Sequence, residues 1–156
     1  MRSYVILHVT NICPYICSLR CVFIFTYQLK MATVTDILEI VKSCTDANEL
    51  SNHFEQLENL LSQTTSDEFA ASNGVDVVTK SLSTDLLQNN VKLASSFGKL
   101  VRQFLNVDNH EIIGPCMSNK FGTLDLLTDC LHIKDGQVVR VAASTLRTLL
   151  FFNYDT

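Results

Sequence analysis

The chain has 156 residues, of which 47% are hydrophobic and 18% charged, with only 5 Gly and 2 Pro. This composition excludes a disordered polar tail, a collagen-like chain and a Gly/Pro-rich loop scaffold, and it favours helices over a sandwich of short strands. Residues 1–30 carry three basic and no acidic side chains, so residues 31–156, with 9 basic and 16 acidic side chains, have a net charge of −7. An acidic body favours a basic partner, and no segment is basic enough to indicate a nucleic-acid surface.

The first thirty residues are apolar and aromatic, and three interpretations of them stay open. They are an extension ahead of a domain that begins at Met31, a signal peptide, or a membrane anchor. There is no small-x-small cleavage site before Lys30, and the apolar runs fall short of the roughly 20 residues that a membrane span needs. We favour the extension, so a membrane partner is expected only if this leader acts as an anchor.

The cysteines divide between the leader and the body. Cys13, Cys17 and Cys21 would align on one helical face, but Pro14 interrupts that helix and a thiolate zinc site usually has four ligands. The remaining thiols are scattered, as expected for reduced cysteines of a cytoplasmic protein; they are Cys44, Cys116 and Cys130.

Residues 31–65 are predicted to form an N-terminal cap of two helices. Thr35 is assigned as the cap of a first, short amphipathic helix, and Asp46 with Glu49 fits a capping pair at the start of a second. The second helix has apolar residues at helical spacing, and a polar break follows from Ser62 to Asp67. These apolar residues are Leu50, Phe54, Leu57, Leu60 and Leu61.

The rest of the chain repeats itself. DVVTKSL at 76–82 corresponds to DLLTDCL at 125–131, an offset of 49, and VKLASSFGKLVRQFL at 91–105 corresponds to VRVAASTLRTLLFFN at 139–153, an offset of 48. A period in the forties is typical of armadillo and HEAT arrays, in which each unit buries its apolar face on the next. We therefore predict an all-α, armadillo/HEAT-like right-handed helical solenoid.

Two repeats are expected, at 66–106 and 107–156. Each has a Ser-Asn pair, a short apolar helix, a mostly polar loop and a longer helix with small residues at its centre, where neighbouring helices approach closely. The loops are assigned to Ser83–Asn90 and His132–Gln137. Two repeats leave one apolar face uncovered, so residues 31–156 alone are expected to be marginally stable or to self-associate.

The segments GVDVVTKSL…NNVKLASSFGKLV and FGTLDLLTDCL…GQVVRVAASTLRTLL resemble armadillo repeats, in which a Gly-containing turn leads into a short second helix and a long third helix. LENLLSQ, FAASNGV and the final Asn-Tyr-Asp are most similar to the N-terminal part of the smg-type small-GTPase GDP-dissociation stimulators. This resemblance implies binding of small GTPases, often prenylated with basic tails, and promotion of GDP release without catalytic residues. The period exceeds the usual armadillo length, so HEAT-like geometry stays open.

Signatures of catalysis, cofactor binding and metal binding are missing from the sequence. There is no G-x-G-x-x-G, P-loop, H-E-x-x-H, Cys-x-x-Cys or EF-hand loop. His53, His110 and His132 stand alone near predicted helix surfaces or ends, without an identifiable nucleophile and base pair. We expect no enzyme, no cofactor and no metal.

The resemblance also indicates where partners would bind. In armadillo arrays the concave groove is lined by the exposed face of each repeat's longest helix. Leu100 and Thr148 stand where peptide-gripping armadillo proteins commonly place Asn, which argues against a nuclear-import or catenin-like function. The expected partner-binding groove consists of Ser96, Lys99, Gln103, Ser144, Arg147 and Thr148.

Two functions remain open for such a groove. The first is a non-enzymatic protein–protein interaction module that regulates small GTPases by binding them and promoting GDP release. The second is a helical-repeat scaffold or assembly chaperone, for example of the proteasome-assembly type, without a nucleotide-exchange role.

Overall fold

The structure is a computed structural model that describes residues 32–62 and 64–152. The interpretations of residues 1–30, including those of Cys13, Cys17 and Cys21, lie outside the described residues. Within the described part the chain is all-helical and contains no strand, which confirms the all-α fold class. None of the helices in this part is both long and apolar enough to cross a membrane.

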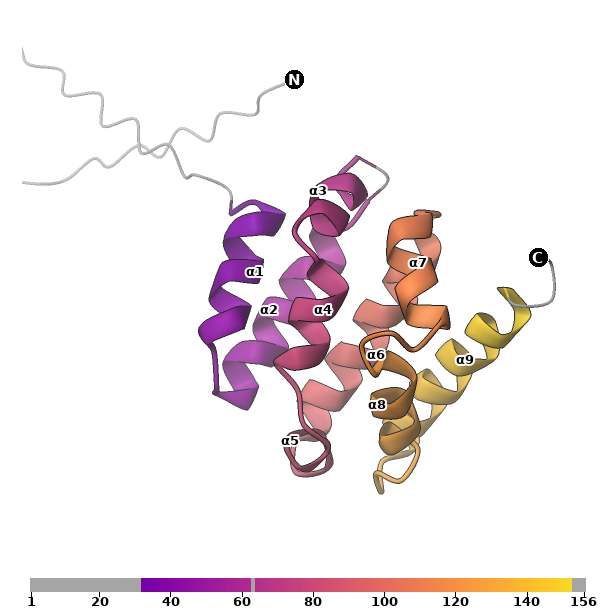
Figure 1. Cartoon of the computed structure of the whole chain (residues 1–156). Helices are drawn as coiled ribbons and strands as arrows, with labels where there is room; N and C mark the ends of the chain where they lie inside the picture. Colours follow the sequence, from indigo (N-terminus) through magenta and orange to yellow (C-terminus); the bar gives the residue numbers. More distant parts are fainter. Residues whose placement is uncertain (1–31, 63, 153–156) are drawn as a thin grey trace, which may run out of the picture. The chain divides into compact units, whose positions relative to one another are not determined.

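Three longer helices are separated by runs of shorter ones along the chain (Figure 1). In order they are α1 (Val34–Ser43), α2 (Ala47–Leu60), α3 (Ser66–Ala71), α4 (Gly74–Lys80), α5 (Thr84–Gln88), α6 (Val91–Asn106), α7 (His110–Met117), α8 (Thr123–Cys130) and α9 (Gly136–Phe152).

The first helix begins two residues earlier than the sequence indicated. Thr33 is the N-cap of α1: its hydroxyl accepts from the Asp36 N–H at 3.2 Å, and its own N–H donates to Asp36 Oδ2 at 3.1 Å. This reciprocal pair needs an acidic side chain three residues after the cap, and Asp36 provides that spacing only for Thr33. The assignment of Thr35 as the cap was wrong, because Thr35 lies within α1 and donates its hydroxyl to Glu68 Oε1 of α3 at 2.8 Å.

The second helix begins where the sequence predicted. Asp46 Oδ1 accepts from the backbone N–H groups of Asn48 and Glu49, each at 2.9 Å. Its apolar residues point into the core, because positions three and four apart share one face of a helix. Of the five predicted, Leu50, Phe54, Leu57 and Leu61 are buried and Leu60 is partly buried against the core.

Three long helices form one layer of the molecule. α2 packs on α6 and α6 packs on α9, and in Figure 1 α2 and α6 lie behind α1 and α4, with the start of α9 behind α8. The shorter helices pack on one another in a similar progression: α1 contacts α4, α4 contacts α7, and α5 contacts α8. The segments α3–α4–α6 and α7–α8–α9 therefore follow one another in the same order, as the matching sequence blocks do.

The predicted loop at Ser83–Asn90 is largely helical. It contains α5, with the Ser83 hydroxyl accepting from the Leu86 N–H at 3.2 Å, and it ends at Asn90, whose Oδ1 caps α6 through the Leu93 N–H at 3.0 Å. The corresponding segment before α9 is shorter. There the Asp135 carboxylate accepts from the N–H groups of Gln137 and Val138, each at 2.9 Å.

One continuous hydrophobic core runs from Val34 in α1 to Leu149 in α9. Phe69 and Phe104 meet at its centre, with ring centroids 5.0 Å apart. Glycine allows two close approaches: a Cβ on Gly74 would lie 2.4 Å from the Phe69 ring, and a Cβ on Gly98 would lie 2.9 Å from Val141 Cγ1. Gly98 therefore lets α9 pack closely on α6, and there the Thr145 hydroxyl also donates to the Gly98 carbonyl at 3.4 Å.

Candidate functional site

The six residues expected to line a groove all lie on α6 and α9, but they are not equally accessible. Ser96 is only 2% exposed, and its hydroxyl lies 2.9 Å from the Ser51 hydroxyl of α2. It also donates to the Lys92 carbonyl and to Glu55 Oε1, at 3.0 and 3.3 Å. The expectation that Ser96 is exposed was wrong, because α2 packs directly over this side of α6.

Two more of the predicted groove residues use their polar groups within the fold. Gln103 donates from Nε2 to the Leu61 carbonyl at 2.8 Å, which ties α6 to the end of α2. Thr148 donates its hydroxyl to the Ser144 carbonyl one turn earlier in α9, at 3.0 Å. Ser144 and Thr148 are half-buried, so neither presents a fully free polar group.

The two cationic groove residues remain available. Lys99 is half-buried and Arg147 is exposed, and neither forms an ion pair within the described residues. The Arg147 guanidinium lies over the Phe151 ring, 5.5 Å from its centroid. Charge is thus the main accessible chemistry of the expected groove.

A surface hollow of about 410 Å³ lies at one end of the long-helix layer. It contains Ser96 and Lys99 but not the other four predicted residues, which the structure leaves outside this hollow. Lysines and carboxylates both border it. The lining residues are Glu55, Val91, Lys92, Ser95, Ser96, Lys99, Asp135, Gln137 and Val138.

Charge is divided sharply between the helices. The described residues contain 9 basic and 15 acidic side chains; α6 and α9 hold five of the basic and none of the acidic ones, which leaves four basic and 15 acidic side chains elsewhere. We call these five side chains the basic face: Lys92, Lys99 and Arg102 of α6, with Arg140 and Arg147 of α9.

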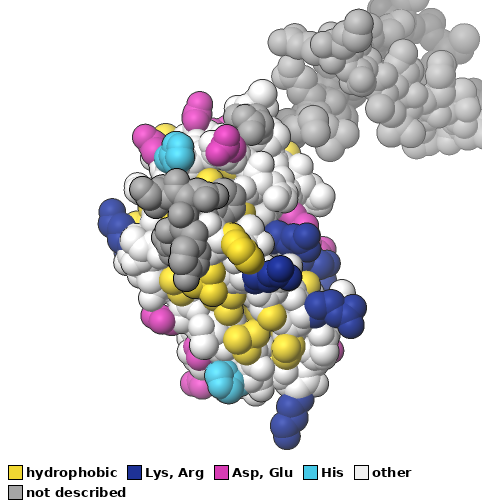
Figure 2. Space-filling model, turned by 90° about the vertical axis from the view of Figure 1, so that its right-hand side faces the viewer, with side chains coloured by type: hydrophobic (Ala, Val, Ile, Leu, Met, Phe, Trp, Pro, Cys, Tyr) yellow, Lys and Arg dark blue, Asp and Glu magenta, His cyan; other side chains and the backbone are white. Residues whose placement is uncertain are grey.

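None of the five cations of the basic face forms an ion pair with an acidic side chain of the described part. The two ion pairs in the described part join Lys42 to Glu39 in α1 and Lys80 to Asp76 in α4, the latter at 2.8 Å. Lys92 instead donates to the neutral Asn52 Oδ1 at 2.8 Å. Figure 2 looks onto the α9 end of the molecule and shows Lys and Arg side chains gathered beside an exposed hydrophobic patch.

Lys92, Arg102 and Arg140 belong to this face but were missed by sequence reasoning. The sequence does contain a signal for them, which is the net charge of each predicted long helix. The net charge of residues 31–156 is −7, and in that sum the cations of the two helices are cancelled by the acids of the rest.

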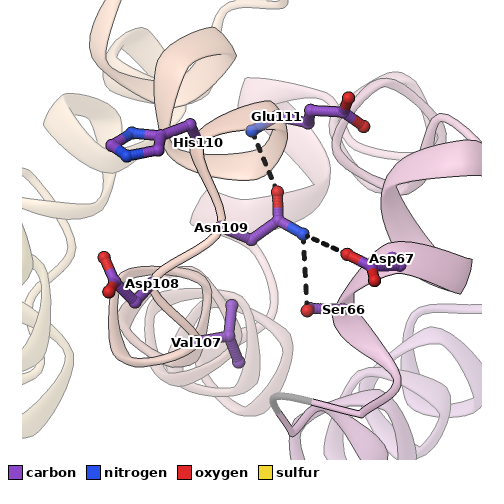
Figure 3. A pocket seen from close by; sticks show the side chains of 7 residues that line it. All are labelled: Ser66, Asp67, Val107, Asp108, Asn109, His110 and Glu111. Carbon is purple, nitrogen blue, oxygen red and sulfur yellow. Dashed lines mark hydrogen bonds between the residues drawn. The ribbon is translucent and has the colours of Figure 1, made fainter.

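A second hollow, of about 540 Å³, lies between the start of α3 and the start of α7 (Figure 3). Asn109 bridges it: Oδ1 accepts from the Glu111 N–H at 2.9 Å, and Nδ2 donates to Asp67 Oδ1 at 3.0 Å and to Ser66 Oγ at 3.3 Å. Asp67, Asp108, Glu111 and His110 also line this hollow. No group of three or more His, Cys, Asp or Glu in the described residues is arranged to hold a metal ion.

The three cysteines of the described part are free thiols, and two of them, Cys116 and Cys130, are buried. Burial raises the pKa of Cys116 to about 12, against the opposing effect of the neighbouring Thr123 hydroxyl, and burial raises the pKa of Cys130 to about 11 with a further contribution from the Asp129 charge. A thiol needs its ionised form to act as a nucleophile, and these two stay protonated near neutral pH. They are packing residues of the core.

No family model, no curated protein and no solved structure gives a significant match to this chain.

Proposed function

We propose that this chain is a non-enzymatic protein-interaction module of the cytoplasm, built as an armadillo-like right-handed helical solenoid, and that it binds proteins on the outward side of α6 and α9. The observation that carries the proposal is the basic face, five cations on two adjacent helices with no ion pair in the described residues. Exposed charges without partners provide the electrostatic complementarity that guides protein association.

The packing of the long helices supports the solenoid part of the proposal. α2, α6 and α9 lie one against the next, and the short helices follow the same order on the other side. The corresponding positions before α4 and α8 also adopt the same unusual conformation, with φ of 52° at Asn73 and 83° at Gly122. A stack of this kind presents one side of its long helices as a continuous surface.

Regulation of small GTPases is the more specific form of this proposal, and it rests on the resemblance to the GDP-dissociation stimulators. A basic tail would be repelled by the basic face. It would be attracted instead to the rest of the described part, which carries 4 basic and 15 acidic side chains. We therefore propose that a GTPase would place its tail on the short-helix side and its folded domain against α6 and α9.

The test combines binding with nucleotide release. The full chain is mixed with a panel of prenylated, basic-tailed small GTPases loaded with a fluorescent GDP analogue, and both complex formation and GDP release are followed. Accelerated release supports the GTPase regulator. A stable complex without any effect on nucleotide favours the scaffold or assembly chaperone.

A matched pair of charge variants tests the binding side. Arg140→Glu with Arg147→Glu reverses two cations of the basic face, whereas Lys42→Glu with Lys120→Glu makes the same change in net charge on α1 and in the α7–α8 turn. We expect partner binding to weaken by about tenfold for the first variant and by less than about twofold for the second. Equal losses in the two variants contradict a binding role for α6 and α9.

A further inference from the structure

We infer that the basic face binds a short acidic segment of a partner protein, one that also carries a large apolar side chain. This inference rests on the proposed function and specifies the chemistry of the partner. Four of the five cations, Lys92, Arg102, Arg140 and Arg147, are exposed, and Lys99 is half-buried at the edge of the hollow between α6 and α9. These cations are available to pair with a partner's carboxylates, because no carboxylate of the described residues lies within ion-pair distance of them.

An apolar contact lies directly beside these charges. Leu150 and Phe151 are 61% and 60% exposed in the last turns of α9, and they are two of the four large hydrophobic side chains exposed in the described part. Arg147 stacks over the Phe151 ring at 5.5 Å. An apolar side chain from the partner would cover Leu150 and Phe151 and exclude water from Arg147. This exclusion of water strengthens the attraction between the Arg147 guanidinium and a carboxylate of the partner.

The other end of the basic face, at the start of α6, also combines cations with an exposed apolar side chain. Val91, at the start of α6, is 45% exposed and borders the hollow that contains Lys92 and Lys99. Two carboxylates also border that hollow: Asp135, which caps α9, and Glu55, which accepts from Ser96. These acids repel a ligand of uniform negative charge, so we expect the acidic groups of the segment to cluster near Arg102, Arg140 and Arg147.

The distribution of charge favours a short segment over a polyanion. Outside α6 and α9 the described residues carry 4 basic and 15 acidic side chains. A nucleic acid or an anionic membrane would extend beyond the basic face and meet this acidic remainder, which repels it. A short segment experiences mainly the charges within about 8 Å of it, the screening length at physiological salt.

The test uses the full chain and fluorescent peptides of defined composition. The probe is an acidic-apolar peptide of about 12 residues that alternates Glu or Asp with Leu and Phe, long enough to span two adjacent helices. Three controls are compared with it: its amide version with Gln and Asn, a poly-glutamate of the same charge, and a single-stranded oligonucleotide. Binding is measured by fluorescence anisotropy at about 50 and 300 mM NaCl.

We expect the acidic-apolar peptide to bind most tightly and to lose about tenfold in affinity at the higher salt concentration. Arg140→Glu with Arg147→Glu should lower its affinity by at least about tenfold, and Lys42→Glu with Lys120→Glu by less than about twofold. Leu150→Ser with Phe151→Ser should remove the preference for this peptide over poly-glutamate. Circular dichroism at each step verifies that the variants fold.

Several outcomes overturn the inference. They are equal binding of the amide peptide, tighter binding of the oligonucleotide, and no peptide binding at all. If no acidic peptide binds but Arg140→Glu with Arg147→Glu still weakens the binding of a folded protein partner, the inference about an acidic segment is wrong and the proposed function stands. If this variant binds every protein partner as tightly as the unchanged chain, both the inference and the proposed function are wrong.

Discussion

At the scale of single residues, the hydroxyl pair Ser51–Ser96 is a buried polar contact between α2 and α6. The two oxygens lie 2.9 Å apart, and both residues are buried. A buried polar atom that loses its partner destabilises the fold more than the net value of the bond. Ser96 therefore stabilises the layer on which the binding side is built.

This pair predicts a non-additive mutant cycle. Ser96→Ala leaves Ser51 without its partner on α6 and should lower the free energy of unfolding by about 1 to 2 kcal/mol. Ser51→Ala should cost less, because Ser96 keeps its bond to the Lys92 carbonyl. The double variant should be more stable than the sum of the single effects indicates, since neither hydroxyl is then left unpaired. Urea unfolding measures all four proteins, and strict additivity would contradict the pairing.

The buried thiols predict a loss of stability in alkali. The pKa of Cys116 rises from 9.0 to about 12 in the folded protein, so between these values the unfolded chain loses a proton that the folded chain keeps. The free energy of unfolding should therefore decrease as the pH rises through this window, by about 1 kcal/mol at pH 10 from this thiol alone.

Cys116→Ala tests this dependence. The variant leaves a small cavity and should be less stable near neutral pH, but its stability should decline less between about pH 7.5 and pH 10. Cys44→Ala is the control, because its thiol is only partly buried. Urea unfolding at the two pH values gives the difference, and an unchanged slope for Cys116→Ala would show that this thiol ionises equally in both states.

At the scale of helices, glycine decides how closely α3 and α4 approach. A Cβ at Gly74 would lie 2.4 Å from the ring of Phe69, which is fully buried and packs against Phe104. The ring cannot retreat without disturbing Phe104. Gly74 thus sets the turn between α3 and α4, and its size matters more than its flexibility.

Alanine substitutions at two glycines distinguish the effect of side-chain size on stability from the effect of helix propensity. Gly74→Ala should lower the free energy of unfolding by about 1 to 3 kcal/mol through overpacking. Gly136→Ala, at the exposed start of α9, meets nothing within 4 Å and should be neutral or stabilise by a few tenths of a kcal/mol. Thermal or urea unfolding compares the two, and equal effects would exclude the contact with Phe69 as the cause.

The helices differ in how much of them the sequence could predict. Apolar spacing located α2, α6 and α9 because each buries one side along several turns. The short α5 escaped prediction, since five residues provide too little periodicity, and only its cap, Ser83, was a local signal. The burial of Ser96 and the contact of Gly74 with Phe69 depend on neighbouring helices, so neither spacing nor composition could have predicted them.

At the scale of the whole molecule, the cations of α6 and α9 are separated from the acidic side chains, which lie on the other described segments. The described residues carry 9 basic and 15 acidic side chains, and five of the basic ones belong to the basic face. The sequence predicted an acidic body and located two of those five cations, Lys99 and Arg147, through the expected groove. The charge of each long helix can be summed from the sequence, but its position on one surface cannot, because that depends on α6 and α9 lying side by side.

This separation makes salt act in opposite directions on folding and on binding. Outside α6 and α9 the described part carries 4 basic and 15 acidic side chains, and the repulsion within this acidic excess is relieved by added salt. Raising NaCl from about 20 to 200 mM should therefore increase the melting temperature by a few degrees. Arg140→Glu with Arg147→Glu lowers the net charge by four, so the melting temperature of this variant should rise more steeply with salt. Over the same range of NaCl the acidic-apolar peptide should bind less tightly.

Differential scanning fluorimetry and anisotropy on the same samples measure both effects, and a melting temperature that falls with salt would show that attraction outweighs repulsion in the folded chain.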